Sequence, residues 1–170
     1  GSLPLRVALG QAVCAALAKA FPKAEVIGID PDAKSIARAK GARFLVNTTA
    51  DMPRGPGFDL VSLCDVLHDL AEPVKTLEEI RALLKPDGTL FIVEPRAADR
   101  LEDNRNAVSA TFYGFSIFHC MTQSLARGGP GLGTCMGPAA AERLAREAGF
   151  GSFRVLDVKS QVNLFYAATP

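Results

Sequence analysis

The chain has 170 residues and a mass of 18.0 kDa, with 48% hydrophobic and 22% charged residues, which is enough for one globular domain spanning residues 1–170. The formal net charge is +1 and no run of like charges marks a tail or stripe, so neither nucleic acid nor a membrane surface is expected as a partner. The apolar stretches are too short for a membrane span, and a small-molecule ligand is the expected partner.

The first third of the chain alternates between strand and helix patterns. LRVAL at 5–9 predicts a strand, and the Ala- and Leu-rich run 11–21 predicts a helix that Pro22 stops. AEVIGID at 24–30 predicts a second strand. A short helix follows through Lys40, ended by Gly41, and ARFLV at 42–46 predicts a third strand.

The middle of the chain continues this alternation. FDLVSLC at 58–64 predicts a buried strand, 74–84 a helix, and 89–93 a second buried strand that the turn KPDG introduces. Such alternation predicts an α/β fold: a Rossmann-like doubly wound sheet, mostly parallel, with right-handed crossovers.

The last part of the chain departs from the pattern. Residues 96–136 hold a charged stretch, an aromatic amphipathic run and the glycine-rich GGPGLGTCMG, and we expect them to form an inserted lid over a substrate site. A helix over 138–150 follows. FRVLDV and NLFYAAT then predict a C-terminal antiparallel hairpin.

The four cysteines are widely spaced and form no C-x-x-C pair: Cys14, Cys64, Cys120 and Cys135. Together with the lack of a secretory leader, this spacing suggests neither a disulfide framework nor a zinc site. We therefore expect a cytoplasmic protein and no bound metal.

The ordered set AFPKAEVIGIDPD, TTADMP, FDLVSLCDVLHDL, LLKPDGTLFIVEP and AGFGSFRVLDV resembles the class I S-adenosylmethionine-dependent methyltransferases. The resemblance covers nearly the whole chain and is strongest to the small-molecule O-methyltransferase-like branch, which includes bacterial two-domain members. It implies a transferase that uses S-adenosylmethionine to methylate a small-molecule acceptor, with a hydroxyl oxygen favoured. Those members carry an N-terminal winged-helix or dimerisation segment, and a homodimer would form through such a segment, which lies outside this chain.

The resemblance assigns the nucleoside part of the cofactor to two groups of residues. Asp30 ends the second strand and Pro31 follows it, at a place where a carboxylate can accept both ribose hydroxyls of a nucleoside. Ala50, Asp51 and Met52 follow the third strand and would hold the adenine. Two alternatives stay open, since Asp30 also suits an NAD-binding fold or a simple turn, and Met52 also suits a hydrophobic core.

The reacting edge would lie after the fourth strand. Cys64 and Asp65 would face the methionine part of the cofactor, and His68 matches the histidine that related plant O-methyltransferases use as general base. Asp69, Asp65 and Glu94 compete as the partner that orients the His68 imidazole, and Glu94 could instead flank the substrate. The alternative for His68 is a structural histidine at a helix start.

An acceptor pocket is expected from the insertion, where Phe112, Tyr113, Phe115 and His119 offer broad faces for a planar substrate. An aromatic run of this kind also suits a helix that packs into the core. His119 and Cys120 have no spaced partner in the sequence, so they predict no metal site.

One family element is missing. The acidic-x-Gly-x-Gly-x-Gly loop after the first strand is reduced to Gly10, which would stand for its last glycine at the cofactor, and at 35–44 the family usually has a longer helix and a further turn before the third strand. Natural loss, trimming, or omission of residues disordered in an unliganded crystal would each explain this, and we favour omission, which an intact mass well above 18.0 kDa would support. The alternative function is a non-catalytic methyltransferase-like ligand-binding or interaction module; an NAD-dependent oxidoreductase fits less well because G-x-G-x-x-G is absent.

Overall fold

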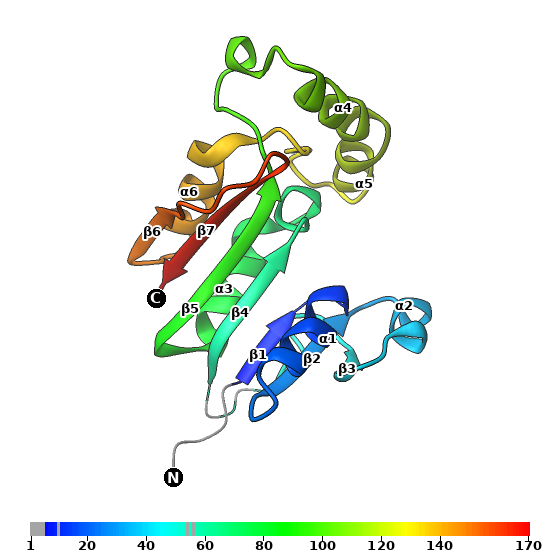
Figure 1. Cartoon of the computed structure of the whole chain (residues 1–170), viewed down its shortest axis with the longest axis vertical. Coiled ribbons are helices and arrows are strands. Elements are labelled where there is room, and N and C mark those ends of the chain that lie inside the picture. Colours follow the sequence, from blue (N-terminus) through cyan, green and yellow to red (C-terminus); the bar gives the residue numbers. More distant parts are fainter. Residues whose placement is uncertain (1–5, 10, 54, 56) are drawn as a thin grey trace.

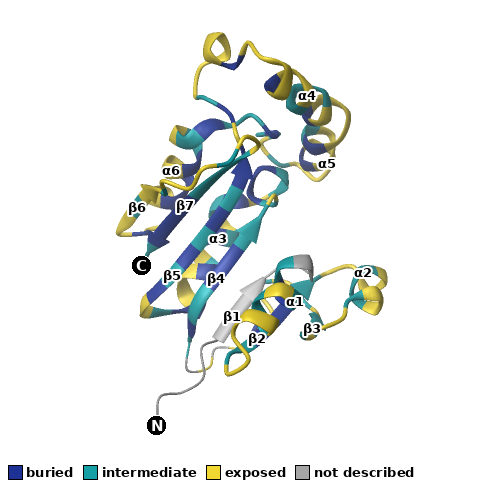
Figure 2. Cartoon of the chain, in the orientation of Figure 1, coloured by how far each residue is buried: buried dark blue, intermediate teal, exposed yellow. Residues whose placement is uncertain are grey.

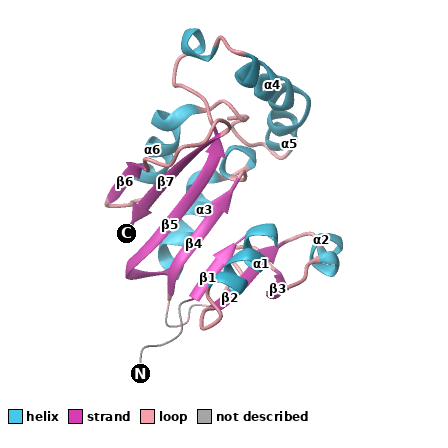
Figure 3. Cartoon of the chain, in the orientation of Figure 1, coloured by secondary structure: helices cyan, strands magenta, loops and turns pink. Residues whose placement is uncertain are grey.

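The computed structural model describes residues 6–9, 11–53, 55 and 57–170. Their strands form one sheet in the order β3-β2-β1-β4-β5-β7-β6 (Figures 1 and 3). β1 to β5 are parallel, whereas β7 is antiparallel to both β5 and β6. The predicted Rossmann-like α/β class with a C-terminal hairpin is confirmed. The strands are β1 (Arg6–Leu9), β2 (Glu25–Asp30), β3 (Arg43–Val46), β4 (Phe58–Cys64), β5 (Leu84–Pro95), β6 (Ser152–Val155) and β7 (Asn163–Thr169).

The principal helices lie where the sequence pattern places them, with ends that differ by up to a few residues. They are α1 (Gln11–Ala20), α2 (Ala33–Arg38), α3 (Pro73–Leu83) and α6 (Gly137–Glu147). Asp32 begins α2, because its carboxylate accepts hydrogen bonds from the backbone N–H groups of Lys34 and Ser35 at 3.2 and 3.0 Å. In the described part of the chain, no helix combines the length and the apolar character needed to cross a membrane.

The prediction for β5 is wrong at its start. The strand begins at Leu84 rather than Thr89, and the KPDG segment is part of it. The pairing with β4 shifts register between Phe58 and Leu60, so the extra residues are accommodated as an irregularity of the ladder. The prediction treated Pro and Gly as a turn before the strand, but in β5 they lie at this irregularity.

Two apolar clusters show that the sheet is covered on both faces. Val26 packs in a cluster with Cys14 of α1, whereas its neighbour Ile27 belongs to the larger cluster that contains Leu77 of α3 and Leu144 of α6. Successive residues of a strand point to opposite faces, so α1 and the α3–α6 pair lie on opposite sides. Figure 2 shows the buried residues concentrated along β4, β5 and β7.

Residues 96–136 form a separate helical group beyond the carboxyl ends of β4 and β5 (Figure 1). It contains η2 (Leu101–Asn104), α4 (Ala107–Phe115), the π-helical turn η3 (Ser116–Cys120) and α5 (Met121–Ala126). The glycine-rich segment then returns to α6. Gly133 has a φ of +73°, and a Cβ there would lie 1.9 Å from the Ser116 hydroxyl, so only glycine fits against η3.

Candidate functional site

The site begins at the end of β4, where the backbone turns sharply. Asp65 has a φ of +53°, in the left-handed region that residues with a Cβ rarely adopt. Its N–H donates to the Val93 carbonyl at 2.9 Å, and its carboxylate accepts from the Asn163 side chain of β7 at 3.4 Å. The turn directs the chain into the short 3₁₀ helix η1 (Leu67–Asp69), which carries the histidine.

His68 and Glu94 form a buried pair between η1 and β5. The two residues are 2% and 1% exposed, and Nδ1 of His68 hydrogen-bonds to Oε2 of Glu94. The other carboxylate oxygen of Glu94 accepts from the N–H of Leu67 at 3.0 Å. Both oxygens of Glu94 therefore hold η1, and among the three predicted partners Glu94 is the one that orients the imidazole through Nδ1.

The charges of the neighbouring carboxylates determine the protonation state of the His68–Glu94 pair. Burial alone would lower the pKa of His68, but the hydrogen bond and charge of Glu94, helped by Asp69 and Asp65, outweigh it and raise the pKa. Burial raises the pKa of Glu94, and the contact with His68 opposes that rise. The pair therefore holds a proton on the imidazole to a higher pH than a free histidine would.

The other nitrogen of His68 faces a second carboxylate. Nε2 lies 3.4 Å from Oδ1 of Asp69, an oxygen that is buried and accepts no hydrogen bond in the described part of the chain. Cys120, buried at the end of η3, comes close to both. Burial and the Asp69 carboxylate raise the pKa of the Cys120 thiol to about 12.

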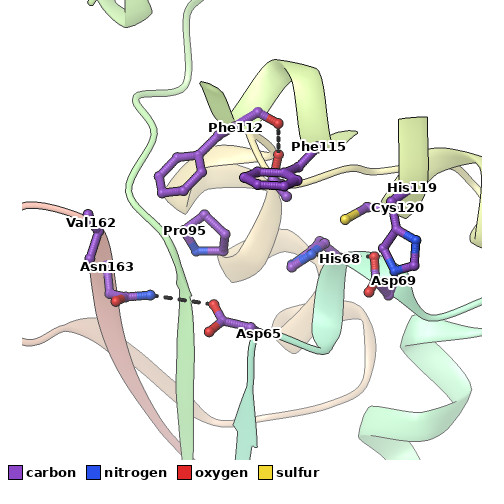
Figure 4. Close-up of a pocket in the computed structure, with 11 residues that line it drawn as sticks. Asp65, His68, Asp69, Pro95, Phe112, Phe115, His119, Cys120, Val162 and Asn163 are labelled. Carbon is purple, nitrogen blue, oxygen red and sulfur yellow. Dashed lines mark hydrogen bonds and ion pairs between the residues drawn. The ribbon is translucent and has the colours of Figure 1, made fainter. Parts of the chain in front are cut away.

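A pocket of about 400 Å³ opens in front of these groups (Figure 4). Asp65, His68 and Asp69 line its sheet side, and Phe112, Phe115 and His119 line its cap side. An apolar pocket with a few polar groups on one wall suits a small organic molecule. Tyr113 does not line this pocket, because its hydroxyl accepts a hydrogen bond from Asn104 at 3.2 Å within the cap.

A second pocket of about 340 Å³ lies between the carboxyl ends of β2 and β4. It is lined by Asp30, Pro31 and Cys64 from the predicted cofactor set, together with Asn47, Thr48 and Thr49. Oδ1 of Asp30 accepts from the N–H of Asp32 at 2.8 Å, which fixes the carboxylate at the strand end. Ligands of open α/β sheets bind at this edge.

The other predicted cofactor residues lie outside this pocket. Ala50 and Asp51 are exposed, and Asp51 accepts from the Thr48 hydroxyl at 2.7 Å. Met52 is 5% exposed within the larger apolar cluster, as the core alternative predicts. Gly10 lies outside the described residues.

Sequence reasoning missed several residues of the site. Val162, Asn163 and Thr134 line the first pocket, and the hydroxyl of Thr134 donates to the Phe112 carbonyl at 2.6 Å. No local motif marks them, since Val162 comes from the β6–β7 connection, Asn163 from the start of β7 and Thr134 from the glycine-rich segment. The signal available was topological: β7 returns beside β5, so the start of β7 must lie near the end of β5.

The comparisons with known proteins agree with this geometry. Residues 9–90 match the family described as a methyltransferase domain. No curated protein matches the chain. The predicted resemblance to class I S-adenosylmethionine-dependent methyltransferases is confirmed at the level of this domain.

Solved structures show the same fold. Human N-acetylserotonin methyltransferase in complex with S-adenosylmethionine is 22% identical, with a TM-score of 0.70 over 98% of this chain and 47% of its own. PigF with S-adenosylhomocysteine is 16% identical, with a TM-score of 0.71 over 98% and 50%. The S-adenosylmethionine-dependent methyltransferase SibL is 20% identical, with a TM-score of 0.67 over 98% and 50%. The chain thus spans about half the length of these proteins.

Proposed function

We propose that this domain transfers the methyl group of S-adenosylmethionine to a hydroxyl oxygen of a small molecule, with His68 as general base. The observation that carries the proposal is the buried Glu94–His68 pair, because His68 lines a pocket whose cap side carries Phe112 and Phe115. A histidine oriented by a carboxylate is suited to remove a hydroxyl proton.

His68 would accept the proton of the acceptor hydroxyl at Nε2 while the O–CH₃ bond forms. When bound, S-adenosylmethionine supplies an electrophilic methyl group on a sulfonium, whose S–CH₃ bond breaks as S-adenosylhomocysteine is released. Glu94 acts as a positioning residue, because it is buried behind the imidazole and stabilises the imidazolium. Phe112 and Phe115 would hold the acceptor and exclude water, and most of the rate gain would come from this alignment.

The pocket between β2 and β4 fits the cofactor. Its volume of about 340 Å³ and its mixture of Asp30, threonine hydroxyls and apolar strand residues suit a nucleoside with a planar aromatic base. Asp30 would hold the ribose hydroxyls, and Cys64 would lie toward the reacting edge. The three carboxylates near His68 favour a cationic sulfonium over a neutral ligand.

A second candidate is a ligand-binding module without turnover. The sequence has the single residue Gly10 between the end of β1 at Leu9 and the start of α1 at Gln11, so it lacks the glycine loop that usually approaches the cofactor. Weak or absent S-adenosylmethionine binding would favour this candidate.

A labelled-methyl transfer assay tests the proposal. We would offer phenols, aliphatic alcohols and their matching methyl ethers with methyl-labelled S-adenosylmethionine. Label that enters only compounds with a free hydroxyl supports oxygen transfer. Label that enters amines or thiols instead would contradict the choice of oxygen.

Removing the Asp30 carboxylate should weaken cofactor binding. For Asp30→Ala we expect Kd for S-adenosylmethionine to rise about 10- to 100-fold, because charge-assisted hydrogen bonds contribute roughly 1.5–3 kcal/mol. Asp32→Ala is the matched control, since Asp32 caps α2 and does not line the pocket. Equal loss of affinity in both variants, measured by calorimetry, would remove Asp30 from the site.

The rate should depend on the protonation of His68. The pKa of His68 lies above its ordinary value of 6.5, so the unprotonated base accumulates only at higher pH and kcat/KM should rise with pH through a midpoint above 6.5. Glu94→Gln removes the charge that raises this pKa and should move the midpoint to lower pH. The measurement is kcat/KM as a function of pH, made on protein from which metal ions have been removed with a chelator. A midpoint in Glu94→Gln equal to that of wild type would contradict the prediction.

A further inference from the structure

The pocket beside His68 contains a cluster of three side chains that could each bind a metal ion. A ring nitrogen of His68, a carboxylate oxygen of Asp69 and Sγ of Cys120 all lie within 4.8 Å of one another. Two of these residues come from η1, and Cys120 comes from the π-helical turn η3. Sequence spacing predicted no metal because the third ligand reaches the site only through the fold.

The distances suit a tetrahedral ion. Zinc binds nitrogen and oxygen ligands at about 2.0–2.1 Å, which places two ligand atoms of a tetrahedral site roughly 3.3–3.4 Å apart. Nε2 of His68 and Oδ1 of Asp69 are 3.4 Å apart. An ion between them needs little movement of either side chain.

Asp69 offers a buried carboxylate oxygen to a cation. Its Oδ1 is buried and accepts no hydrogen bond within the described residues. A buried carboxylate oxygen without a donor is unfavourable, and a metal ion would satisfy it.

The surroundings of His68 complete the arrangement. Metal-binding histidines usually hydrogen-bond through their second nitrogen to a carboxylate, which fixes the ring and strengthens the ligand. Glu94 makes this contact at Nδ1 of His68. The described residues that line the pocket include Asp65 and Asp69 and no lysine or arginine, so the local field attracts cations.

We propose that His68, Asp69 and Cys120 bind a zinc ion, with a fourth position open to the pocket. A set of one imidazole, one carboxylate and one thiolate favours Zn²⁺ over Mg²⁺ or Ca²⁺, which prefer oxygen ligands. Binding displaces the thiol proton of Cys120 to solvent and, wherever the imidazole is protonated, the Nε2 proton of His68 as well, so one or two protons are released for each ion bound.

Zinc in this site would inhibit methyl transfer. The ion occupies Nε2 of His68, the atom that would take the acceptor proton, so the base is lost while zinc is bound. This consequence rests on the proposed function, whereas zinc binding itself does not. The cluster would thus make activity sensitive to free zinc.

The test measures zinc affinity by competition with a chromophoric chelator, and the ligand set by the spectrum with Co²⁺. Wild type should bind one Zn²⁺ and show a thiolate-to-cobalt charge-transfer band. Cys120→Ser should abolish the band, and Cys120→Ser and Asp69→Asn should each weaken zinc binding about 10-fold or more. Cys135→Ser, at a free cysteine outside the cluster, should match wild type.

Two results would overturn the site: no charge-transfer band in wild type, or equal weakening in Cys135→Ser. If Cys120→Ser fails to fold, Asp69→Asn decides, because that side chain is one-third exposed. Mg²⁺ should not compete with Zn²⁺ for this site. Zinc binding without inhibition of methyl transfer would leave the site standing and contradict the role of His68 as base, so the two proposals fail separately.

Discussion

His68→Ala should reduce kcat for methyl transfer about 10²- to 10⁴-fold, the range that a positioned general base contributes. The affinity for S-adenosylmethionine should stay nearly unchanged, because the pocket between β2 and β4 does not include His68. Steady-state kinetics and calorimetry on the same preparation measure the two effects. The reason for the large loss is that alanine has no group that can accept the proton of the acceptor hydroxyl.

The contrasting variant is His119→Gln. His119 lines the cap side of the pocket and is exposed, so its loss should raise KM for the acceptor more than it lowers kcat. His68→Ala with folding intact and kcat within about threefold of wild type would exclude His68 as the base. A large fall in kcat for His119→Gln alone would transfer the assignment to His119.

Glu94→Ala should destabilise the fold by about 3–5 kcal/mol, because breaking a buried charged pair leaves its partner uncompensated. The N–H of Leu67 would lose its acceptor as well, so η1 would lose both contacts that hold it to β5. Urea denaturation followed by circular dichroism measures this, with the slope checked for two-state behaviour.

Two further variants make the result specific. Glu94→Gln keeps the shape and one acceptor oxygen, so it should lose less stability than Glu94→Ala. Glu78→Ala removes an exposed carboxylate of α3 and should leave the denaturation midpoint unchanged. A midpoint for Glu94→Ala equal to that of Glu78→Ala would show that the pair does not hold η1.

Much of the fold could be predicted from the sequence, because it depends on local patterns. Apolar runs that end in Asp30, Cys64-Asp65 and Glu94 marked three strand ends, and those residues lie at one edge of the sheet. The antiparallel hairpin also followed from two short apolar runs. The start of β5 could not be predicted from the sequence, because the KPDG segment has the residue pattern of a turn and its pairing with β4 is known only from the structure.

The candidate site could be predicted only in part. His68 and Glu94 are 26 residues apart, and the motif suggested both without showing that they touch. Tyr113 and Phe112 are adjacent in an aromatic run, yet only Phe112 lines the pocket, because the helix turns Tyr113 toward Asn104. The approach of Cys120 to Asp69 depends on the π-helical turn, which no residue pattern announces.

The most direct test of the account is calorimetric titration of the mass-checked chain with S-adenosylmethionine and, separately, with NAD. The account predicts saturable binding of S-adenosylmethionine with a micromolar Kd, weakened by Asp30→Ala, and no binding of NAD. If the chain is folded, its mass has been verified and it still binds neither compound, the result would contradict the methyltransferase proposal. It would favour a ligand-binding module that has lost the cofactor site.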